Sequence, residues 1–323
     1  MIETTLFRSE TLTARHFGKP GQARRLLICF AYYDHRDHET QTASAVRFFQ
    51  RFDVDFILVT PHSNAWYQYA DKQRCYDLIR SIGTGFDETI CYGGSMGGYE
   101  ALKSAALLGA RRVLAISPQF SIDPHKVPFE TRWRTEADQT RFIDDDMRLS
   151  SDIDYCVLSD PFDRLDERHL KLICAAGGAI RRFPVPFGTH FLAHMLSETG
   201  LMEGILRDFL ADSLDEGVFR KGVRVRRDRS ITYLAAVLRK VDRLRKRGTI
   251  RDDKLRDAIV ERIVGLDTTV PRNHFLKSQL CERTGRTDAA IASAKRAVEA
   301  NPDHPGFRAH LDRLLENHRE LDQ

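Results

Sequence analysis

The chain has 323 residues, of which 42% are apolar and 30% are charged, and its formal net charge is +4. This composition is typical of a globular protein, and it excludes a disordered or fibrous chain. No apolar run approaches the roughly 18 residues that a membrane-spanning helix needs, so we expect no transmembrane segment.

The first residues and the cysteines both suggest a cytoplasmic protein. The N-terminal stretch lacks a basic segment followed by an apolar one, so we expect no signal peptide. The six cysteines include no pair with the C-x-x-C spacing of a metal or redox site. We therefore expect free, mostly buried thiols in a reducing compartment, with no metal and no cofactor.

Short apolar strands alternate with helical patterns from about residue 24 to about residue 210. Because the intervening helices are long, this alternation predicts βαβ units and a mostly parallel α/β sheet with helices on both faces. Residues 121–151 interrupt the pattern with a polar segment that could form a lid. The predicted strands cover residues 26–33, 54–60, 88–94, 112–117, 153–159 and 179–187, and the predicted helices cover 38–52, 75–82, 98–110, 167–176 and 191–210.

The character of the chain changes after residue 215, and we predict two domains, 1–215 and 216–323. The second part is expected to be helical, with one weak strand signal at 218–226. Within it, the spacing of small residues and a proline resembles a tetratricopeptide repeat, in which two helices cross closely. The residues that match are Gly285, Ala290, Ala297 and Pro302. This resemblance implies a small helical module that could bind a protein partner.

Residues 93–97 read Gly-Gly-Ser-Met-Gly and match the motif G-x-S-x-G. A predicted strand precedes them and a predicted helix follows, which places Ser95 on a sharp turn that requires glycine two residues to either side. Two alternatives remain open: a glycine-rich turn with an idle serine, and a phosphate-binding turn. The second is disfavoured because the chain has no G-x-x-x-x-G-K-[ST] sequence.

With this motif in this context, residues 20–212 resemble the α/β-hydrolase superfamily. The resemblance implies a Ser-acid-His triad in that chain order, with Ser95 as nucleophile. His190, which follows the last predicted strand, is the implied base, and His194 one turn later is interpreted as a packed or surface residue. The acid should lie in the loop 160–166, where Asp163 fits best, Asp160 is the alternative, and Asp166 is interpreted as a helix N-cap.

The resemblance also implies two backbone N–H groups that stabilise an oxyanion. They are assigned to Met96, directly after the nucleophile, and to Tyr32, in the loop expected after the apolar residues 26–30 of the first predicted strand. That loop lacks the His-Gly signature common in the superfamily and reads Phe-Ala-Tyr-Tyr at residues 30–33. The candidate substrate-binding residues are Tyr33, Asn64, Trp66 and Gly94.

The function implied is that of a serine hydrolase that cleaves an ester or related acyl bond through an acyl-enzyme. The substrate would be an acylated small molecule, glycan or lipid. An acyl-transferase, and a weakly active hydrolase fold that serves as a protein-interaction module, are the alternatives. The segment 220–247 holds twelve Lys and Arg residues and two Asp. It has few interleaved aromatics, so we expect a solvated face or a site for an anionic partner rather than a nucleic-acid site.

Overall fold

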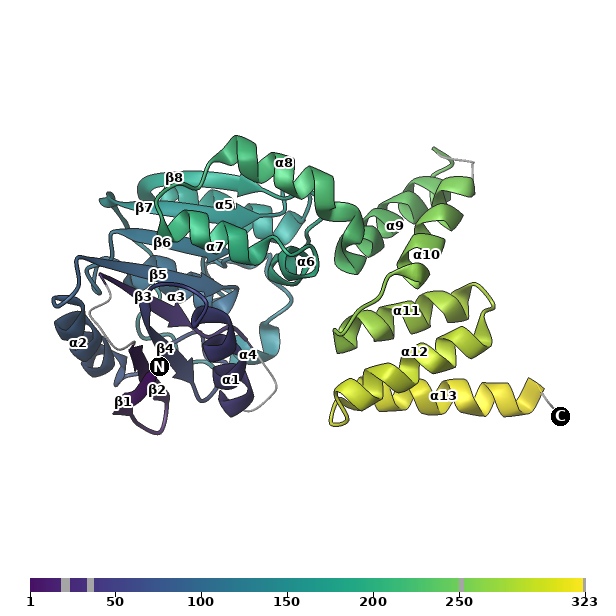
Figure 1. The fold of residues 1–323 in the computed structure, drawn as a ribbon, viewed down its shortest axis with the longest axis horizontal. Coiled ribbons are helices and arrows are strands. Elements are labelled where there is room, and N and C mark those ends of the chain that lie inside the picture. The colour runs from purple at the N-terminus through teal and green to yellow at the C-terminus, as the bar shows by residue number, and fades with distance from the viewer. Residues whose placement is uncertain (19–23, 34–37, 250–252, 322–323) are drawn as a thin grey trace. The chain divides into compact units, whose positions relative to one another are not determined.

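The computed structural model describes residues 1–18, 24–33, 38–249 and 253–321 (Figure 1). The chain divides into two compact units. The sheet unit comprises Met1–Ala193 and Met202–Lys221, and the helical unit comprises His194–Leu201 and Gly222–Gln323. The predicted boundary at residue 215 lies near the last crossing between the units, after Lys221, but the segment His194–Leu201 also groups with the helical unit.

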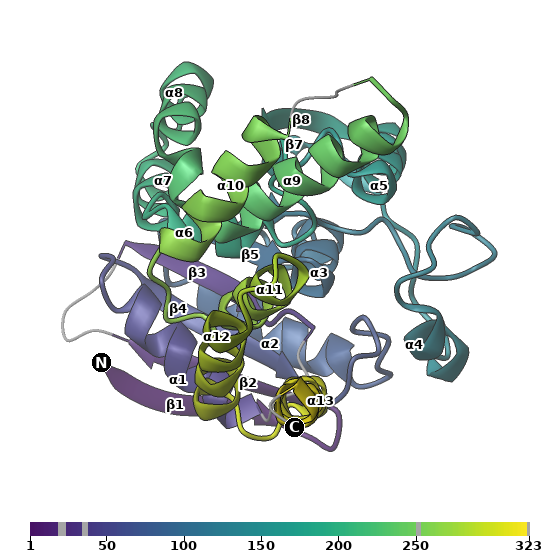
Figure 2. The same ribbon diagram turned by 90° about the vertical axis from the view of Figure 1, so that its right-hand side faces the viewer.

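The described residues form one eight-stranded sheet with the order β1-β2-β4-β3-β5-β6-β7-β8. The pairs β1–β2 and β2–β4 are antiparallel, and every later pair is parallel. This order, with helices on both faces, is the α/β-hydrolase fold (Figures 1 and 2). The strands are β1 (Ile2–Arg8), β2 (Leu12–Gly18), β3 (Arg25–Phe30), β4 (Asp55–Pro61), β5 (Glu88–Gly94), β6 (Arg112–Ile116), β7 (Leu149–Ser159) and β8 (Gly177–Pro184).

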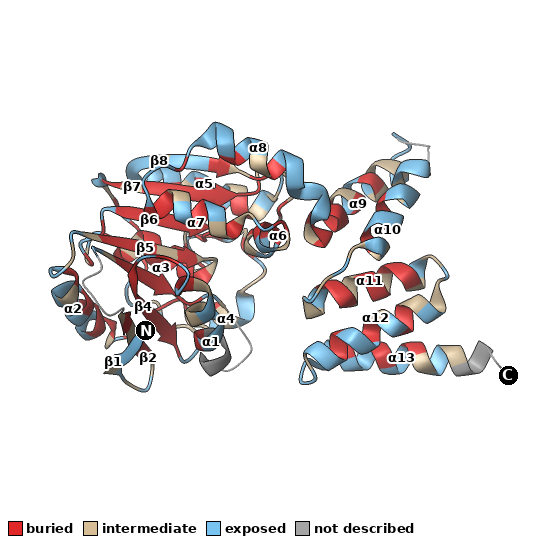
Figure 3. Cartoon of the chain, viewed as in Figure 1, coloured by how far each residue is buried: buried red, intermediate tan, exposed pale blue. Residues whose placement is uncertain are grey.

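The central strands form the core because they are apolar along most of their length. Every residue of β4 and β6 is buried, as the red strands in Figure 3 show. A parallel strand covered by helices on both faces needs such a continuous apolar run, whereas a strand with one wet face alternates. The antiparallel hairpin of β1 and β2 was not predicted. Its strands contain polar residues throughout and give no buried-strand signal.

The helices differ from the predicted ones in two places. The single helix expected over 191–210 is broken into α6 and α7, because Gly200 adopts a φ of +67° between them. The weak strand signal at 218–226 lies in helix α8. The helices up to this point are α1 (His38–Phe49), α2 (Lys72–Gly83), α3 (Met96–Ser104), α4 (Arg134–Gln139), α5 (Arg164–Ala175), α6 (Leu192–Glu198), α7 (Met202–Leu210) and α8 (Glu216–Arg226).

The polar segment of residues 121–151, here called the insertion, lies mostly between β6 and β7, and the only helix in it is the short α4 (Figure 2). It is anchored rather than loose, since Ile122, Val127 and Ala137 are buried. Its polar residues therefore reach the carboxyl edge of the sheet from a fixed position. The loops after β5, β6, β7 and β8 begin at that same edge, because these four strands are parallel neighbours and their carboxyl ends lie together.

The helical unit has its own small core. Its later helices are α9 (Ile231–Lys246), α10 (Lys254–Gly265), α11 (Pro271–Arg283), α12 (Thr287–Ala300) and α13 (Pro305–Leu321). Gly285 takes a φ of +73° in the turn between α11 and α12, and Ala290 and Ala297 are fully buried. Small side chains at these positions allow the helices to pack closely. In the described part of the chain, no helix is both long enough and apolar enough to cross a membrane.

Candidate active site

Ser95 lies on a sharp turn between β5 and α3, with φ 51° and ψ −120°. This conformation is costly for a residue with a side chain and is held by its surroundings. A Cβ on Gly93 would lie 2.2 Å from the carbonyl oxygen of Gly97, and one on Gly97 would lie 2.3 Å from that of Phe30. Glycine is therefore required at both places, as the motif predicted.

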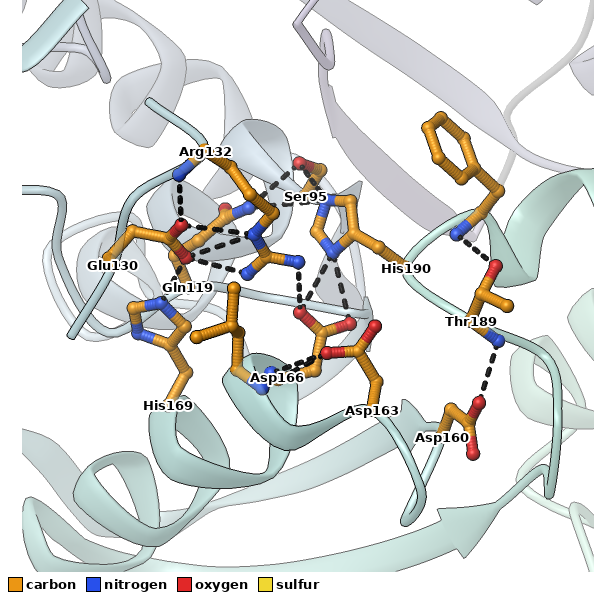
Figure 4. A network of polar contacts seen from close by, with 12 residues as sticks. Ser95, Gln119, Glu130, Arg132, Asp160, Asp163, Asp166, His169, Thr189 and His190 are labelled. Atoms are coloured by element: carbon orange, nitrogen blue, oxygen red, sulfur yellow. Dashed lines mark hydrogen bonds and ion pairs between the residues drawn. The ribbon is translucent and has the colours of Figure 1, made fainter. Parts of the chain in front are cut away.

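Ser95 and His190 are joined directly. The Ser95 Oγ lies 2.9 Å from His190 Nε2, and His190 Nδ1 lies 2.9 Å and 3.0 Å from the two carboxylate oxygens of Asp166 (Figure 4). If the Nδ1–H donates to the carboxylate, Nε2 carries a lone pair that accepts the serine proton. The contacts therefore connect the Ser95 hydroxyl to the His190 imidazole, and the imidazole to the Asp166 carboxylate. Along the sequence these residues follow the order serine, acid, histidine.

The structure exchanges the roles predicted for two aspartates. Asp163 was expected to contact the histidine, but it is the N-cap of α5, where its carboxylate accepts the N–H groups of Leu165 and Asp166 at 3.1 Å. Asp166, expected to be that cap, lies in the first turn of α5 and contacts His190. The helix begins at Arg164, earlier than predicted, and this turns Asp166 toward the histidine and Asp163 toward the backbone.

The alternative acid, Asp160, contacts the backbone instead of the imidazole. Its carboxylate accepts the N–H groups of Phe162, Phe187 and Thr189 at 2.8 to 3.1 Å. Burial raises the pKa of this carboxyl, and the three backbone donors partly offset the effect. Phe187 and Thr189 have positive φ values of 63° and 59°, so Asp160 holds a strained loop that delivers His190 to the site.

Asp166 is nearly fully buried, and opposing influences act on its charge. Burial raises its pKa, but His190 and the guanidinium of Arg132 lower it more, so the net shift is downward. The Arg132 Nη1 lies 2.8 Å from the Asp166 Oδ1. The carboxylate therefore stays ionised beside the imidazole, which fits a group that orients the ring and stabilises its protonated form.

Arg132 is itself held by a second carboxylate. Glu130 contacts the guanidinium of Arg132 at 2.6 to 3.1 Å, and its Oε2 lies 2.8 Å from His169 Nε2. The backbone N–H of Phe120 donates to His169 Nδ1, so a neutral His169 must carry its proton on Nε2 and donate to Glu130. The insertion thus supports the Asp166 carboxylate through a fixed polar network.

Sequence reasoning missed Glu130, Arg132 and His169, and it also missed Gln119. The Gln119 side chain is fully buried, and its Nε2 lies 3.0 Å from Ser95 Oγ. These residues carry no local motif, and only the predicted insertion 121–151 marked the region that supplies two of them. Their grouping arises from the order of the strands.

The predicted oxyanion donors lie at the start of α3 and beside it. Met96 is the first residue of α3, where backbone N–H groups have no acceptor within the helix. The carbonyl oxygens of Phe30 and Ala31 lie 2.3 and 2.9 Å from where a Gly97 Cβ would be, so the segment leading to Tyr32 runs against this turn. Both positions are compatible with the predicted roles, which remain predictions.

An aromatic cluster lies beside the imidazole. The ring of Trp133, from the insertion, lies 4.8 Å from that of Tyr33, 5.3 Å from that of Trp66 and 5.9 Å from that of His190. The Tyr33 hydroxyl donates to Glu136 at 2.9 Å. Two of the predicted substrate-binding residues, Tyr33 and Trp66, therefore contact the same tryptophan that packs beside the histidine.

The remaining predicted residues, Asn64, Gly94 and His194, differ in burial and position. Asn64 is half-buried in the segment after β4, and Gly94, also half-buried, ends β5 next to Ser95. His194 is exposed and groups with the helical unit. Among the described residues, no three His, Cys, Asp or Glu side chains are arranged to hold a metal ion.

No protein-family model matches the chain, and no curated protein matches it in sequence. Solved structures do match. An esterase from Thermogutta terrifontis has 12% identity and a TM-score of 0.46, covering 65% of this chain and 90% of its own. The mouse alpha/beta hydrolase domain-containing protein 10 has 14% identity and a TM-score of 0.46, covering 67% and 100%. The capsule O-acetyltransferase of Neisseria meningitidis serogroup A has 12% identity and a TM-score of 0.43, covering 57% and 86%. Since these likenesses are remote, the site is interpreted from this chain's own contacts.

Proposed function

We propose that this chain is a serine hydrolase that cleaves an ester or a related acyl bond. The observation that carries the proposal is the continuous contact from Ser95 Oγ through His190 to Asp166. The strained turn supports it, because it exposes the serine at the start of a helix, where backbone N–H groups favour developing negative charge.

The geometry supports the following sequence of steps. Ser95 Oγ attacks the acyl carbon while its proton passes to His190 Nε2, and Asp166 stabilises the resulting imidazolium. The proton then goes to the departing alcohol or thiol, leaving an acyl group on Ser95. Water or another acceptor attacks this acyl-enzyme, with His190 again taking and returning a proton. Met96 and Tyr32 are the proposed backbone donors to the oxyanion.

Labelling with a fluorophosphonate probe, followed by intact-mass measurement, tests this proposal. The wild-type chain should gain one probe adduct, and Ser95→Ala should gain none. His190→Ala should label at least about 100-fold more slowly, since it loses its general base. His194→Ala, the matched control, should label like the wild type. A wild-type chain that does not label, or a Ser95→Ala variant that does, contradicts the proposal.

We infer further that the helical unit is a tetratricopeptide-like module that binds a protein partner. The buried Ala290 and Ala297 and the left-handed Gly285 support this inference. The basic stretch of residues 220–247 would favour an acidic partner. The cysteines are unpaired, which is in keeping with our proposal that the protein is cytoplasmic.

A further inference from the structure

Gln119 follows β6, and its side-chain amide lies within hydrogen-bond distance of both Ser95 Oγ and His190 Nε2. Its Nε2 lies 3.0 Å from Ser95 Oγ and 3.3 Å from His190 Nε2 (Figure 4). The side chain is fully buried. The next residue, Phe120, is fixed through its backbone N–H to the buried His169. The amide is therefore held in place by both the backbone and the packing around it.

The hydrogen-bond pattern explains which end of the amide faces the serine. A neutral His190 that donates from Nδ1 to Asp166 presents a lone pair at Nε2. A Gln119 oxygen 3.3 Å from that lone pair would be repelled, whereas an N–H is attracted. The N–H end therefore faces Ser95 and His190, and it donates to the serine oxygen.

The oxygen end of the Gln119 amide is not explained by these contacts. Gln119 Oε1 is buried and has no hydrogen-bond partner among the described residues. A buried acceptor without a partner costs about 1–3 kcal/mol, so such an atom calls for an explanation. By covalent geometry, Oε1 lies roughly 2.3 Å from Nε2, and so within roughly 5.6 Å of His190 Nε2. A water molecule that donates one proton to each acceptor holds them roughly 4.5–5 Å apart, which lies within this upper limit.

We propose that Gln119 is a catalytic residue that selects water as the acyl acceptor. This inference rests on the function proposed above. A water molecule has two protons, so it can donate one to His190 Nε2 and the other to Gln119 Oε1. An alcohol has a single hydroxyl proton and can satisfy only one of these acceptors. The site therefore favours hydrolysis over acyl transfer.

Hydrolysis of the acyl-enzyme begins with the bound water. The water oxygen bonds to the acyl carbon, one water proton passes to His190 Nε2, and the second stays on the oxygen, hydrogen-bonded to Gln119 Oε1. The bond between the acyl carbon and Ser95 Oγ then breaks, and His190 returns its proton to Oγ. The Gln119 N–H stabilises the negative charge that builds on Oγ as it leaves. The products are a carboxylic acid and free Ser95.

The experiment compares Gln119→Leu with wild type, using p-nitrophenyl acetate in buffer with and without methanol. The p-nitrophenol burst reports acylation, and the steady state reports deacylation. We expect Gln119→Leu to hydrolyse its acyl-enzyme about 10–100-fold more slowly, since it loses two hydrogen bonds. The ratio of methyl acetate to acetate should rise at least about fivefold, because methanol does not need the lost acceptor.

Two further variants separate the parts of the proposal. Gln119→Glu keeps an acceptor but loses the N–H donor, so it should acylate more slowly while keeping the wild-type product ratio. Ser117→Ala, in the same segment after β6, removes a buried hydroxyl that also lacks a partner among the described residues. It serves as the matched control and should leave both rates and the ratio unchanged. Thermal melting establishes that each variant is folded. If Gln119→Leu does not fold, the acylation rate of Gln119→Glu still tests whether the Gln119 N–H acts as a donor to Ser95.

The outcomes distinguish the two proposals. If wild type forms an acyl-enzyme but Gln119→Leu deacylates within about twofold of it, with the same product ratio, the role of Gln119 is refuted and the hydrolase function stands. The role is also refuted if Gln119→Glu acylates at the wild-type rate. If wild type forms no acyl-enzyme, both proposals fail.

Discussion

The turn that holds Ser95 and the segment that holds Asp166 contribute to the same chain of contacts, but they are built differently. The turn, residues 93–97, depends on glycines within itself and on its close approach to the end of β3. The segment of residues 160–166, which enters α5, depends on contacts from distant parts of the chain, among them Arg132 and the loop before His190. A local structure can be read from a motif, whereas a structure built from long-range contacts leaves several similar residues as candidates.

The largest expected effect comes from breaking the local turn. In Gly97→Ala, the new Cβ would lie 2.3 Å from the carbonyl oxygen of Phe30, and backbone atoms cannot move aside cheaply. We expect a loss of about 3 kcal/mol in the free energy of unfolding, measured by urea denaturation, together with loss of probe labelling.

Gly94→Ala is the control for this stability effect, because its Cβ would lie 3.8 Å from the nearest atom. Its free energy of unfolding should stay within about 0.5 kcal/mol of wild type. Equal stability of Gly97→Ala and wild type would show that the turn is not constrained as described.

A smaller, pH-dependent effect should come from the long-range contacts of Asp166. Arg132 helps to lower the pKa values of Asp166 and Glu130 in the folded state, against the effect of burial. Carboxyls with lowered pKa values contribute stability above their unfolded pKa values of about 4, and this contribution is lost as the pH falls through the folded values. Arg132→Gln should therefore cost roughly 2 kcal/mol at pH 7 and clearly less at pH 3, measured by urea denaturation at both pH values.

Arg168→Gln is the matched control, because that guanidinium lies over the ring of Phe129, 3.8 Å from its centroid. Its cost should not change between pH 7 and pH 3. A cost of Arg132→Gln that is constant or grows toward low pH would show that Arg132 does not act through these carboxylates.

The smallest effect concerns the helix cap. Asp163→Ala removes the acceptor for the N–H groups of Leu165 and Asp166, so the free energy of unfolding should fall by about 1 kcal/mol. Asp163→Asn, which keeps a capping oxygen, should recover most of that loss. Thermal or urea denaturation measures both, and an unchanged stability of Asp163→Ala would contradict the capping role.

The sequence was sufficient to predict the sheet core and the sharp turn that carries Ser95, because apolar strands and glycine spacing are local signals. His190 could be placed because it follows the last strand. The choice between Asp163 and Asp166 could not be made, since both suit the first turn of a helix and differ only in where the helix begins. The contacts of Gln119, Glu130 and His169 could not be predicted from the sequence, because they form only once the strands are ordered in the sheet.

The exchange of roles between Asp163 and Asp166 is tested most directly by measuring kcat/KM of Asp166→Asn and Asp163→Asn side by side with p-nitrophenyl acetate. Asp166→Asn should lose roughly 10³–10⁴-fold, because the imidazole loses the carboxylate that fixes its tautomer. Asp163→Asn should stay within about threefold of wild type, because an asparagine can still cap the helix. A large loss in Asp163→Asn together with a near wild-type Asp166→Asn would contradict the proposed triad of Ser95, His190 and Asp166.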